Sequence, residues 1–319
     1  MLSYTWLQMT TIITDVAEEP ELKLFVRHYW SSRFGTTRER DLYEAIRKHI
    51  RNKTQAVDLA KSLAKAAGFY ASLSNPASDT WDEYDPAVRE SVEVLEQLGV
   101  SQLRPLLIAI FGHFAAAEVT NALPMLVGWT VRFLICGSGG SGTLETAYSD
   151  RAKEVSAGTV KTAAQLYAAM KDIVPDDKTF EARFASATVS NSSLAKYYLR
   201  VIEKQKMAKE GELIVNPSDA VNLEHVLPKT PGADWNHIPA ADQKTLLKRI
   251  GNLTLLHSKR NARVGNASFE KKKEVFKDSS VQITKDICAH PTWDEATIKT
   301  RQLELAKIAV KAWRAKPHV

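Results

Sequence analysis

Apolar positions along the first two thirds of the chain recur at helical spacing and predict helices separated by polar turns. Between Arg38 and Ile50, for example, Leu42, Tyr43, Ile46 and Ile50 stand at helical spacing, and the preceding Thr36-Thr37 pair is expected to provide capping residues. The same periodicity predicts helices over residues 21–30, 38–50, 56–73, 87–98, 103–136, 144–170 and 192–206. The turn-rich, acidic segment 74–86 is predicted to be a connection at the surface.

Sequence typical of strands appears only in the last third of the chain. The candidate strands are Gly211–Val215, Leu223–Leu227 and Asn252–Leu256. A polar insertion, residues 234–248 with a short helix from Ala240, separates the last two, and helical spacing returns after Asn261. This order predicts a β-hairpin followed by a helix.

A final helix is predicted from Pro291-Thr292, because Thr292 and Glu295 have the spacing of a capping box. Its apolar positions, expected to pack onto the hairpin, are Ile298, Leu305, Ile308, Ala309 and Trp313. The sequence therefore predicts a mainly α fold, with a helical domain over residues 1–205 and a small ββα domain embedded in helices over residues 206–319.

The positive charge is concentrated at one end of the chain. The formal net charge is +6, yet residues 1–200 carry 22 Lys and Arg against 23 Asp and Glu, whereas residues 201–319 carry 21 against 14. An excess of basic residues beside the predicted hairpin suits a polyanion such as nucleic acid, and a solvated basic surface is the competing interpretation.

Cysteine usage and hydropathy favour a cytoplasmic protein without a membrane segment. Cys136 and Cys288 stand far apart and form no metal-binding pair, which suits a reducing compartment. The most apolar region, residues 106–136, is interrupted by His113, Glu118 and Arg132, so core helices are expected there. The N-terminus lacks the features of a signal peptide.

The glycine-rich run 137–142 lacks a following Lys-Ser/Thr and is predicted to be a flexible connection, not a phosphate loop.

Candidate catalytic chemistry gathers at the predicted hairpin. His225 lies on the first strand, and a neutral imidazole can accept a proton from water near pH 7. Glu224 offers a carboxylate, although neighbours in a regular strand point to opposite faces. Asn261 and Asn266 offer amide oxygens, the ligand type that one hard divalent cation prefers, and Asn261 could also be a helix N-cap. Asn252 is suited to steady the loop around the histidine by side-chain hydrogen bonds.

The run LEHVLPK followed by GNLTLLHSKRNARVGN resembles the C-terminal HNH (ββα-metal) nuclease domain of the GmrSD and SspE family of prokaryotic anti-phage restriction proteins. HYWSSRFG and VGWTVRFLICG are similar to the connecting region of that family. The resemblance implies a DNA endonuclease that uses Mg²⁺ or Mn²⁺, with His225 as general base. Glu224 and Asn261 would be metal ligands, Asn266 would compete with Asn261 for the ligand role, and Asn252 would steady the base.

The resemblance also implies double-stranded phage DNA as substrate and a nucleotide-hydrolysing N-terminal domain. No such domain occurs in this chain, so a C-terminal fragment or one part of a split system is expected.

Six basic residues near the hairpin are predicted to contact DNA phosphates. They are Lys259, Arg260, Arg263, Lys271, Lys272 and Lys273, and for the three consecutive lysines a solvated helix face is the alternative. Two other functions remain open at this point. One is a DNA-binding or sensor-coupling module whose catalytic site has decayed, and the other is a helical interaction scaffold.

Overall fold

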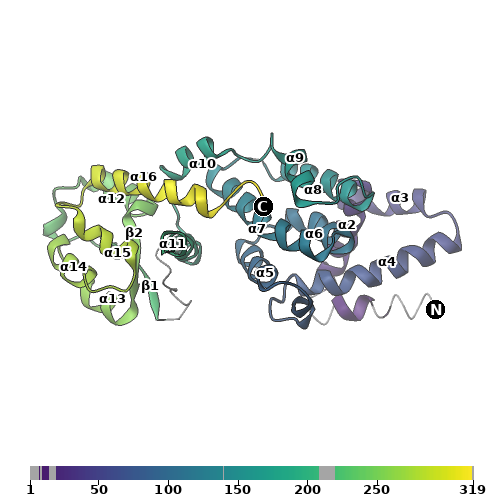
Figure 1. Cartoon of the computed structure of the whole chain (residues 1–319), viewed down its shortest axis with the longest axis horizontal. Helices are drawn as coiled ribbons and strands as arrows, with labels where there is room; N and C mark the ends of the chain where they lie inside the picture. Colours follow the sequence, from purple (N-terminus) through teal and green to yellow (C-terminus); the bar gives the residue numbers. More distant parts are fainter. Residues whose placement is uncertain (1–6, 8, 14–18, 139, 208–219, 318–319) are drawn as a thin grey trace. The chain divides into compact units, whose positions relative to one another are not determined.

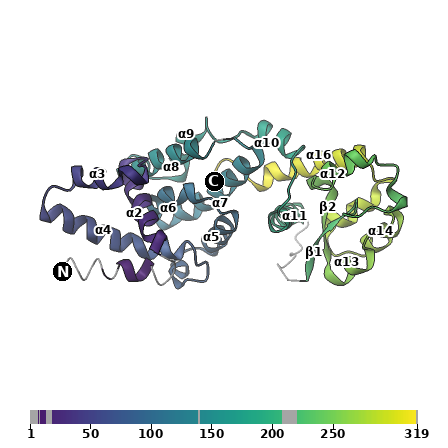
Figure 2. The same ribbon diagram turned by 180° about the vertical axis from the view of Figure 1, so that it is seen from behind.

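The computed structural model describes residues 7, 9–13, 19–138, 140–207 and 220–317, which fold into two compact units. Unit 1 comprises Met1–Pro175 and Ala315–Val319, and unit 2 comprises Asp176–Arg314. Figure 1 shows the order of the elements, and Figure 2 shows them from behind. The predicted mainly α fold is confirmed, since helices dominate and the strands of the described residues form one two-stranded sheet.

Unit 1 is helical throughout the part that the structure describes. Its helices are α2 (Glu19–Phe34), α3 (Glu39–His49), α4 (Lys53–Ser72), α5 (Pro86–Leu98), α6 (Arg104–His113), α7 (Ala116–Cys136), α8 (Ser141–Ser156) and α9 (Ala163–Met170), with 3-10 turns η1 (Asp79–Glu83) and η2 (Ser101–Leu103). Helix α6 is the centre, packing against α2, α4 and α8, and its residues from Pro105 to Phe111 are all buried. Gly99 ends α5 at a φ of 66°, a conformation that favours glycine.

Helix α7 is long and apolar enough to cross a membrane by length and composition alone. However, 67% of its most apolar window is buried inside unit 1, and Arg132 within it is fully buried, with Nη1 donating to the carbonyl of Pro175 at 2.8 Å. These contacts identify α7 as a core helix, as the interrupting charges predicted.

The acidic segment 74–86 does more than connect α4 to α5. Trp81, within η1, is 1% exposed, and its indole Nε1 donates to the carbonyl of Asn75 at 3.1 Å. The turn signals in the sequence correctly predicted a break between helices, but they gave no indication that an aromatic anchor fixes this segment to the core.

Unit 2 surrounds a short hairpin with helices. Its elements are α10 (Asp177–Phe184), α11 (Ser192–Met207), β1 (Val221–His225), η3 (Ala233–Trp235), α12 (Ala240–Leu246), η4 (Ile250–Asn252), β2 (Leu253–His257), α13 (Ser258–Val264), α14 (Phe269–Phe276), α15 (Gln282–Lys285), η5 (Asp286–Ala289) and α16 (Glu295–Ala312). In both views the hairpin lies between α11 and the pair α13–α14. A core that includes Leu227, Trp235, Leu256, Trp293 and Ile298 lies beneath it.

Two details of unit 2 differ from the prediction. β1 ends at His225 instead of continuing to Leu227, because Asn252 bonds the backbone of Leu227 outside the strand. Helix α16 is capped by Asp294, whose Oδ1 accepts from Thr297 N at 2.8 Å, so Thr292 is not the cap. The candidate strand Gly211–Val215 lies outside the described residues.

Along the chain, unit 1 gives way to unit 2 between Pro175 and Asp176. Helices α10 and α11 therefore belong to unit 2. The domain division expected from the sequence falls at 205/206, after these two helices. The division into compact units describes packing and does not test where one functional domain ends and the next begins. The predicted functional boundary at 205/206 therefore stays a prediction.

Candidate active site

The hairpin places Glu224 and His225 on opposite faces of β1. The strands pair antiparallel without interruption, with Glu224 opposite Thr254 and His225 opposite Leu253. Successive side chains of a regular strand alternate between faces. The uninterrupted register therefore provides no bulge that would bring both side chains to one site.

Glu224 is held in a buried ion pair. Lys272, on α14, is 0% exposed, and its Nζ lies 2.5 Å from Oε1 of Glu224 and 2.8 Å from the carbonyl oxygen of His225. Burial raises the pKa of Glu224 and lowers the pKa of Lys272, while the attraction between the two charges opposes both shifts. Lys272 thus joins α14 to the end of β1 at the histidine.

These contacts correct two site expectations. The carboxylate of Glu224, expected to bind a metal ion, is already neutralised by an ammonium group in the interior. Lys272, expected to contact DNA, has no exposed surface through which to do so. A lysine and a glutamate can both be buried when they are paired, because the opposite charge of each offsets the cost of removing the other from water.

His225 is partly buried at the last position of β1. Burial lowers the pKa of its imidazole to about 4, with the positive charges of Lys229 and Lys272 acting in the same direction. The imidazole is therefore neutral near pH 7, which is the form that accepts a proton.

Asn252 fixes the backbone that follows His225. Its Oδ1 accepts from Leu227 N at 2.7 Å and from Trp293 Nε1 at 3.0 Å, and its Nδ2 donates to the carbonyl of Leu227 at 3.1 Å. Its own carbonyl accepts from Val226 N at 3.0 Å. Asn252 is 0% exposed, and its bonds hold the loop that follows His225; its expected role of steadying the base stays a prediction.

The turn before Asn252 is held by α16. Arg301 Nη1 donates to the carbonyls of Gly251 and Leu253 at 2.6 and 2.9 Å, and Gln302 Oε1 accepts from Gly251 N at 3.1 Å. A Cβ at Gly251 would clash with the carbonyl oxygen of Ile298, so only glycine fits against α16 here. The sequence did not reveal that Lys272 pairs with Glu224, or that Trp293, Arg301 and Gln302 bond Asn252 and the residues beside it. No local pattern marks a partner that lies 40 or more residues away.

Asn261 lies inside α13 and joins it to β1. The N-cap of α13 is His257, whose Nδ1 accepts from Lys259 N at 3.3 Å, so the alternative that Asn261 caps the helix is wrong. Nδ2 of Asn261 donates to the carbonyl of Leu223 at 3.3 Å, two residues before His225. Since the amide nitrogen is used in this bond, the Oδ1 oxygen is the atom left to accept a proton donor or a cation. Asn266 is exposed, just after Gly265.

The basic residues expected at a DNA interface fall into three groups. Lys259, Arg263 and Lys271 are exposed. Arg260 and Lys273 are half-buried beside acidic side chains: Arg260 Nη1 lies 3.9 Å from Asp278, and Lys273 Nζ lies 2.8 Å from Glu270. Lys272 is the buried partner of Glu224.

Among the residues that the structure describes, no group of three or more His, Cys, Asp and Glu side chains is arranged to hold a metal ion. The oxygen donors expected from the sequence are thus the amides of Asn261 and Asn266 and the carboxylate of Glu224, which is paired with Lys272. This set fits a cation that keeps most of its waters and takes few protein ligands, as Mg²⁺ does when it binds together with a phosphate.

Unit 2 thus combines a strand that ends in a neutral histidine, a buried asparagine that bonds the residues after it, and a helix that carries a second asparagine. Residues 174–308 match the family model described as the C-terminal domain of GmrSD restriction endonucleases. This part of the chain is therefore similar to that family, which bears out the resemblance to GmrSD restriction endonucleases over a segment that nearly coincides with unit 2. A comparison with curated proteins finds no match.

Proposed function

We propose that the chain is a metal-dependent HNH-type DNA endonuclease that acts in prokaryotic anti-phage restriction. The observation that carries the proposal is His225, a neutral imidazole at the end of β1, where Lys272 bonds the carbonyl of the histidine and Asn252 bonds the backbone of the next two residues. The match of residues 174–308 to a restriction endonuclease family supports a nuclease acting on DNA. Double-stranded phage DNA is the proposed substrate and the cytoplasm the proposed location.

In the proposed reaction His225 is the general base. A water molecule loses a proton to a ring nitrogen of His225 while its oxygen bonds to phosphorus, and the bond between phosphorus and the leaving sugar oxygen breaks. Lys272 bonds the carbonyl of His225, and Asn252 bonds the backbone of Val226 and Leu227, so the two would fix the position of the imidazole relative to the phosphate. When bound, one divalent cation would supply positive charge to the phosphate and the leaving oxygen.

Asn261 is the proposed protein ligand of that cation, with Asn266 as the alternative. The bond from Asn261 Nδ2 to the carbonyl of Leu223 orients the amide beside the strand that carries His225. Glu224 is not proposed as a ligand, because its charge is neutralised by Lys272. The exposed residues Lys259, Arg263 and Lys271 would contact backbone phosphates of the DNA. A nucleotide-hydrolysing partner, on a separate subunit or domain, would complete the defence system.

Cleavage of supercoiled plasmid tests the activity directly. We expect nicked or linear product with Mg²⁺ or Mn²⁺ and none with excess EDTA, while gel-shift affinity for the same DNA in EDTA remains. Equal cleavage in EDTA would contradict metal dependence. Absence of cleavage with every divalent ion, together with retained DNA binding, would favour a DNA-binding module without catalysis.

Substitution Asn261→Ala is expected to abolish cleavage and weaken Mn²⁺ binding while unit 2 stays folded. The variant loses an amide oxygen at the cation and a single 3.3 Å hydrogen bond to Leu223, worth about 1 kcal/mol. Calorimetric Mn²⁺ titration and circular dichroism measure the two effects, with Asn266→Ala as the matched control. Unchanged Mn²⁺ affinity in Asn261→Ala and weaker affinity in Asn266→Ala would transfer the ligand role to Asn266.

DNA affinity is expected to fall steeply with salt. If Lys259, Arg263 and Lys271 each neutralise one phosphate, affinity should drop roughly 40-fold between about 50 and 200 mM salt. Lys271→Ala should lower the slope of log affinity against log salt by about 1, whereas Lys311→Ala, on α16, should leave it unchanged. A flat salt response in fluorescence anisotropy would favour the interpretation that the helices form an interaction scaffold.

A further inference from the structure

Unit 1 contains a small cavity between helices α2, α4 and α6 and the end of α8, where basic side chains from three helices meet. Its volume is about 100 Å³, room for only a few water molecules. The lining includes Tyr29, Arg33, Ser62, Lys65, Phe69 and His113, and none of the lining residues is acidic. We call this pocket the basic cavity.

The three basic side chains of the basic cavity lie close enough to act on one another. Partial burial lowers the pKa of His113, and the positive charges of Arg33 and Lys65 lower it further. Among the described residues, neither Arg33 nor Lys65 forms an ion pair with a carboxylate. Both are exposed, so an anion can reach them from solvent. Like charges gathered in a concave site raise the local concentration of an ion of opposite sign.

Contacts between the helices hold the wall of the basic cavity in place. The guanidinium carbon of Arg33 lies over the ring of Tyr29, 5.1 Å from its centroid, and the Tyr29 hydroxyl hydrogen-bonds Ser62 and Arg33. Ser156 Oγ donates to the carbonyl of Ser32 at 2.8 Å and so ties α8 to α2. A cation that is already positioned loses less freedom when it binds a ligand.

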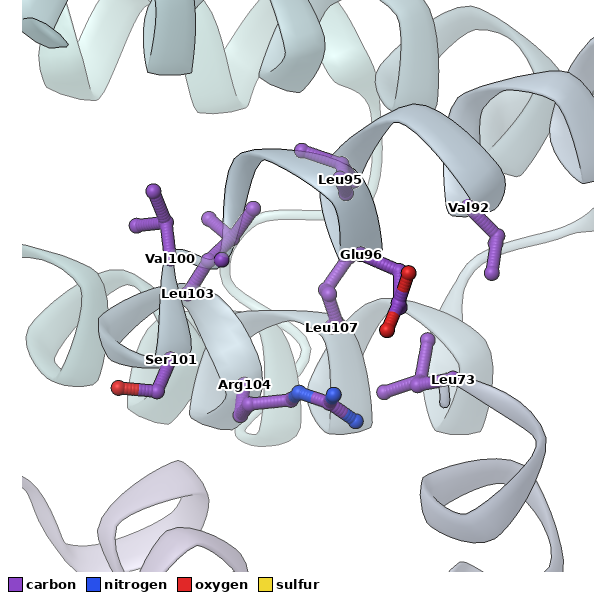
Figure 3. Close-up of a pocket in the computed structure, with 10 residues that line it drawn as sticks. Leu73, Val92, Leu95, Glu96, Val100, Ser101, Leu103, Arg104 and Leu107 are labelled. Carbon is purple, nitrogen blue, oxygen red and sulfur yellow. The ribbon is translucent and has the colours of Figure 1, made fainter. Parts of the chain in front are cut away.

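A second cavity in unit 1 has different electrostatics. Its volume is about 200 Å³, and Figure 3 shows that the carboxylate of Glu96 and the guanidinium of Arg104 lie at the same edge of it. Arg104 already donates to Ser74 Oγ at 2.9 Å and lies over the ring of Tyr70. An anion there would meet a carboxylate as well as a guanidinium, whereas the basic cavity presents positive charge alone.

We propose that the basic cavity binds the phosphate group of a small phosphate monoester whose organic part is apolar. Such a phosphate carries about 1.5 to 2 negative charges near pH 7 and three acceptor oxygens, which suit Arg33, Lys65 and the imidazole of His113. Phe69, whose ring is stacked on Phe111 with centroids 5.6 Å apart, offers apolar contact to the organic part. This site lies in unit 1 and does not depend on the proposed nuclease activity.

Phenyl phosphate and methyl phenyl phosphate are matched probes, because they share the ring and differ in whether the phosphate is a monoester or a diester with a single charge. We expect calorimetry with the full chain in phosphate-free buffer to show that phenyl phosphate binds more tightly. Lys65→Gln should weaken its binding roughly tenfold, the loss of one hydrogen bond between charged groups. Lys61→Gln, at an exposed position one turn earlier on α4, should leave the affinity unchanged.

Fluorescence anisotropy with a short DNA duplex distinguishes a small phosphate monoester from the phosphate backbone of DNA. We expect Lys65→Gln to leave duplex affinity unchanged, and its Tm without ligand to stay at the wild-type value, since Lys65 is exposed. The proposal is overturned if phenyl phosphate does not bind, or if Lys65→Gln binds it as tightly as wild type. It is also overturned if Lys65→Gln weakens duplex and phenyl phosphate equally, which would make the basic cavity a contact for DNA.

Discussion

Substitution His225→Ala is expected to reduce plasmid cleavage by roughly 10²- to 10⁴-fold, the usual contribution of a positioned general base. His225 is the neutral imidazole at the end of β1, and alanine there has no nitrogen to accept the proton of the attacking water. The side chain is only partly buried, so DNA affinity and Tm should stay near the wild-type values. Single-turnover cleavage rates at saturating Mg²⁺, with Tm measured alongside, test this expectation.

His257→Ala is the matched control for this experiment. His257 ends β2 as His225 ends β1, but it is exposed and its Nδ1 caps α13. We expect the cleavage rate of His257→Ala to lie within a few-fold of wild type. Its stability should fall by no more than the contribution of one helix cap. If His225→Ala cleaves as fast as wild type, the general-base assignment is wrong. If His257→Ala is the variant that loses activity, the base lies on β2 instead.

Substitution Lys272→Met is expected to destabilise unit 2 by about 3–5 kcal/mol, because it leaves the Glu224 carboxylate buried without a counter-charge. The same change releases the carbonyl of His225 from its 2.8 Å bond to Lys272 Nζ. Tm should fall by roughly 10 °C, and any protein that remains folded should cleave more slowly. Differential scanning calorimetry and chemical denaturation measure the loss.

The double variant Glu224→Gln/Lys272→Met separates the ion pair from other effects of the mutation. Replacing both partners removes the unpaired charge, so most of the lost stability should return. Lys271→Met, at the exposed neighbouring position, should change stability by less than about 0.5 kcal/mol. Glu224→Gln alone should leave Mn²⁺ affinity unchanged, and a large loss of Mn²⁺ binding would restore Glu224 as a metal ligand.

Local pattern in the sequence was sufficient for several of the helices. Apolar spacing predicted the positions of α3, α4, α5 and α11 closely. Helices α4, α5 and α11 each bury one face, and the spacing of that face is a property of neighbouring residues in the sequence, whereas α3 buries only Leu42. The helix breaks at Gly99 and Gly137 were equally local, since glycine most readily adopts their positive φ. The order of hairpin and helix, and the prominence of His225, Asn252 and Asn261, also followed from short motifs.

The sequence by itself thus determined the helical class, the hairpin and the residues around which a catalytic site can form. Only the tertiary structure decided which contacts each of those residues makes. Lys272 stands in a run of three lysines that suggests an exposed basic face, yet α14 turns this one inward onto Glu224, 48 residues earlier in the chain. A buried charge is tolerated only beside its partner, and which residues become partners depends on how distant segments pack, a property that no local pattern contains.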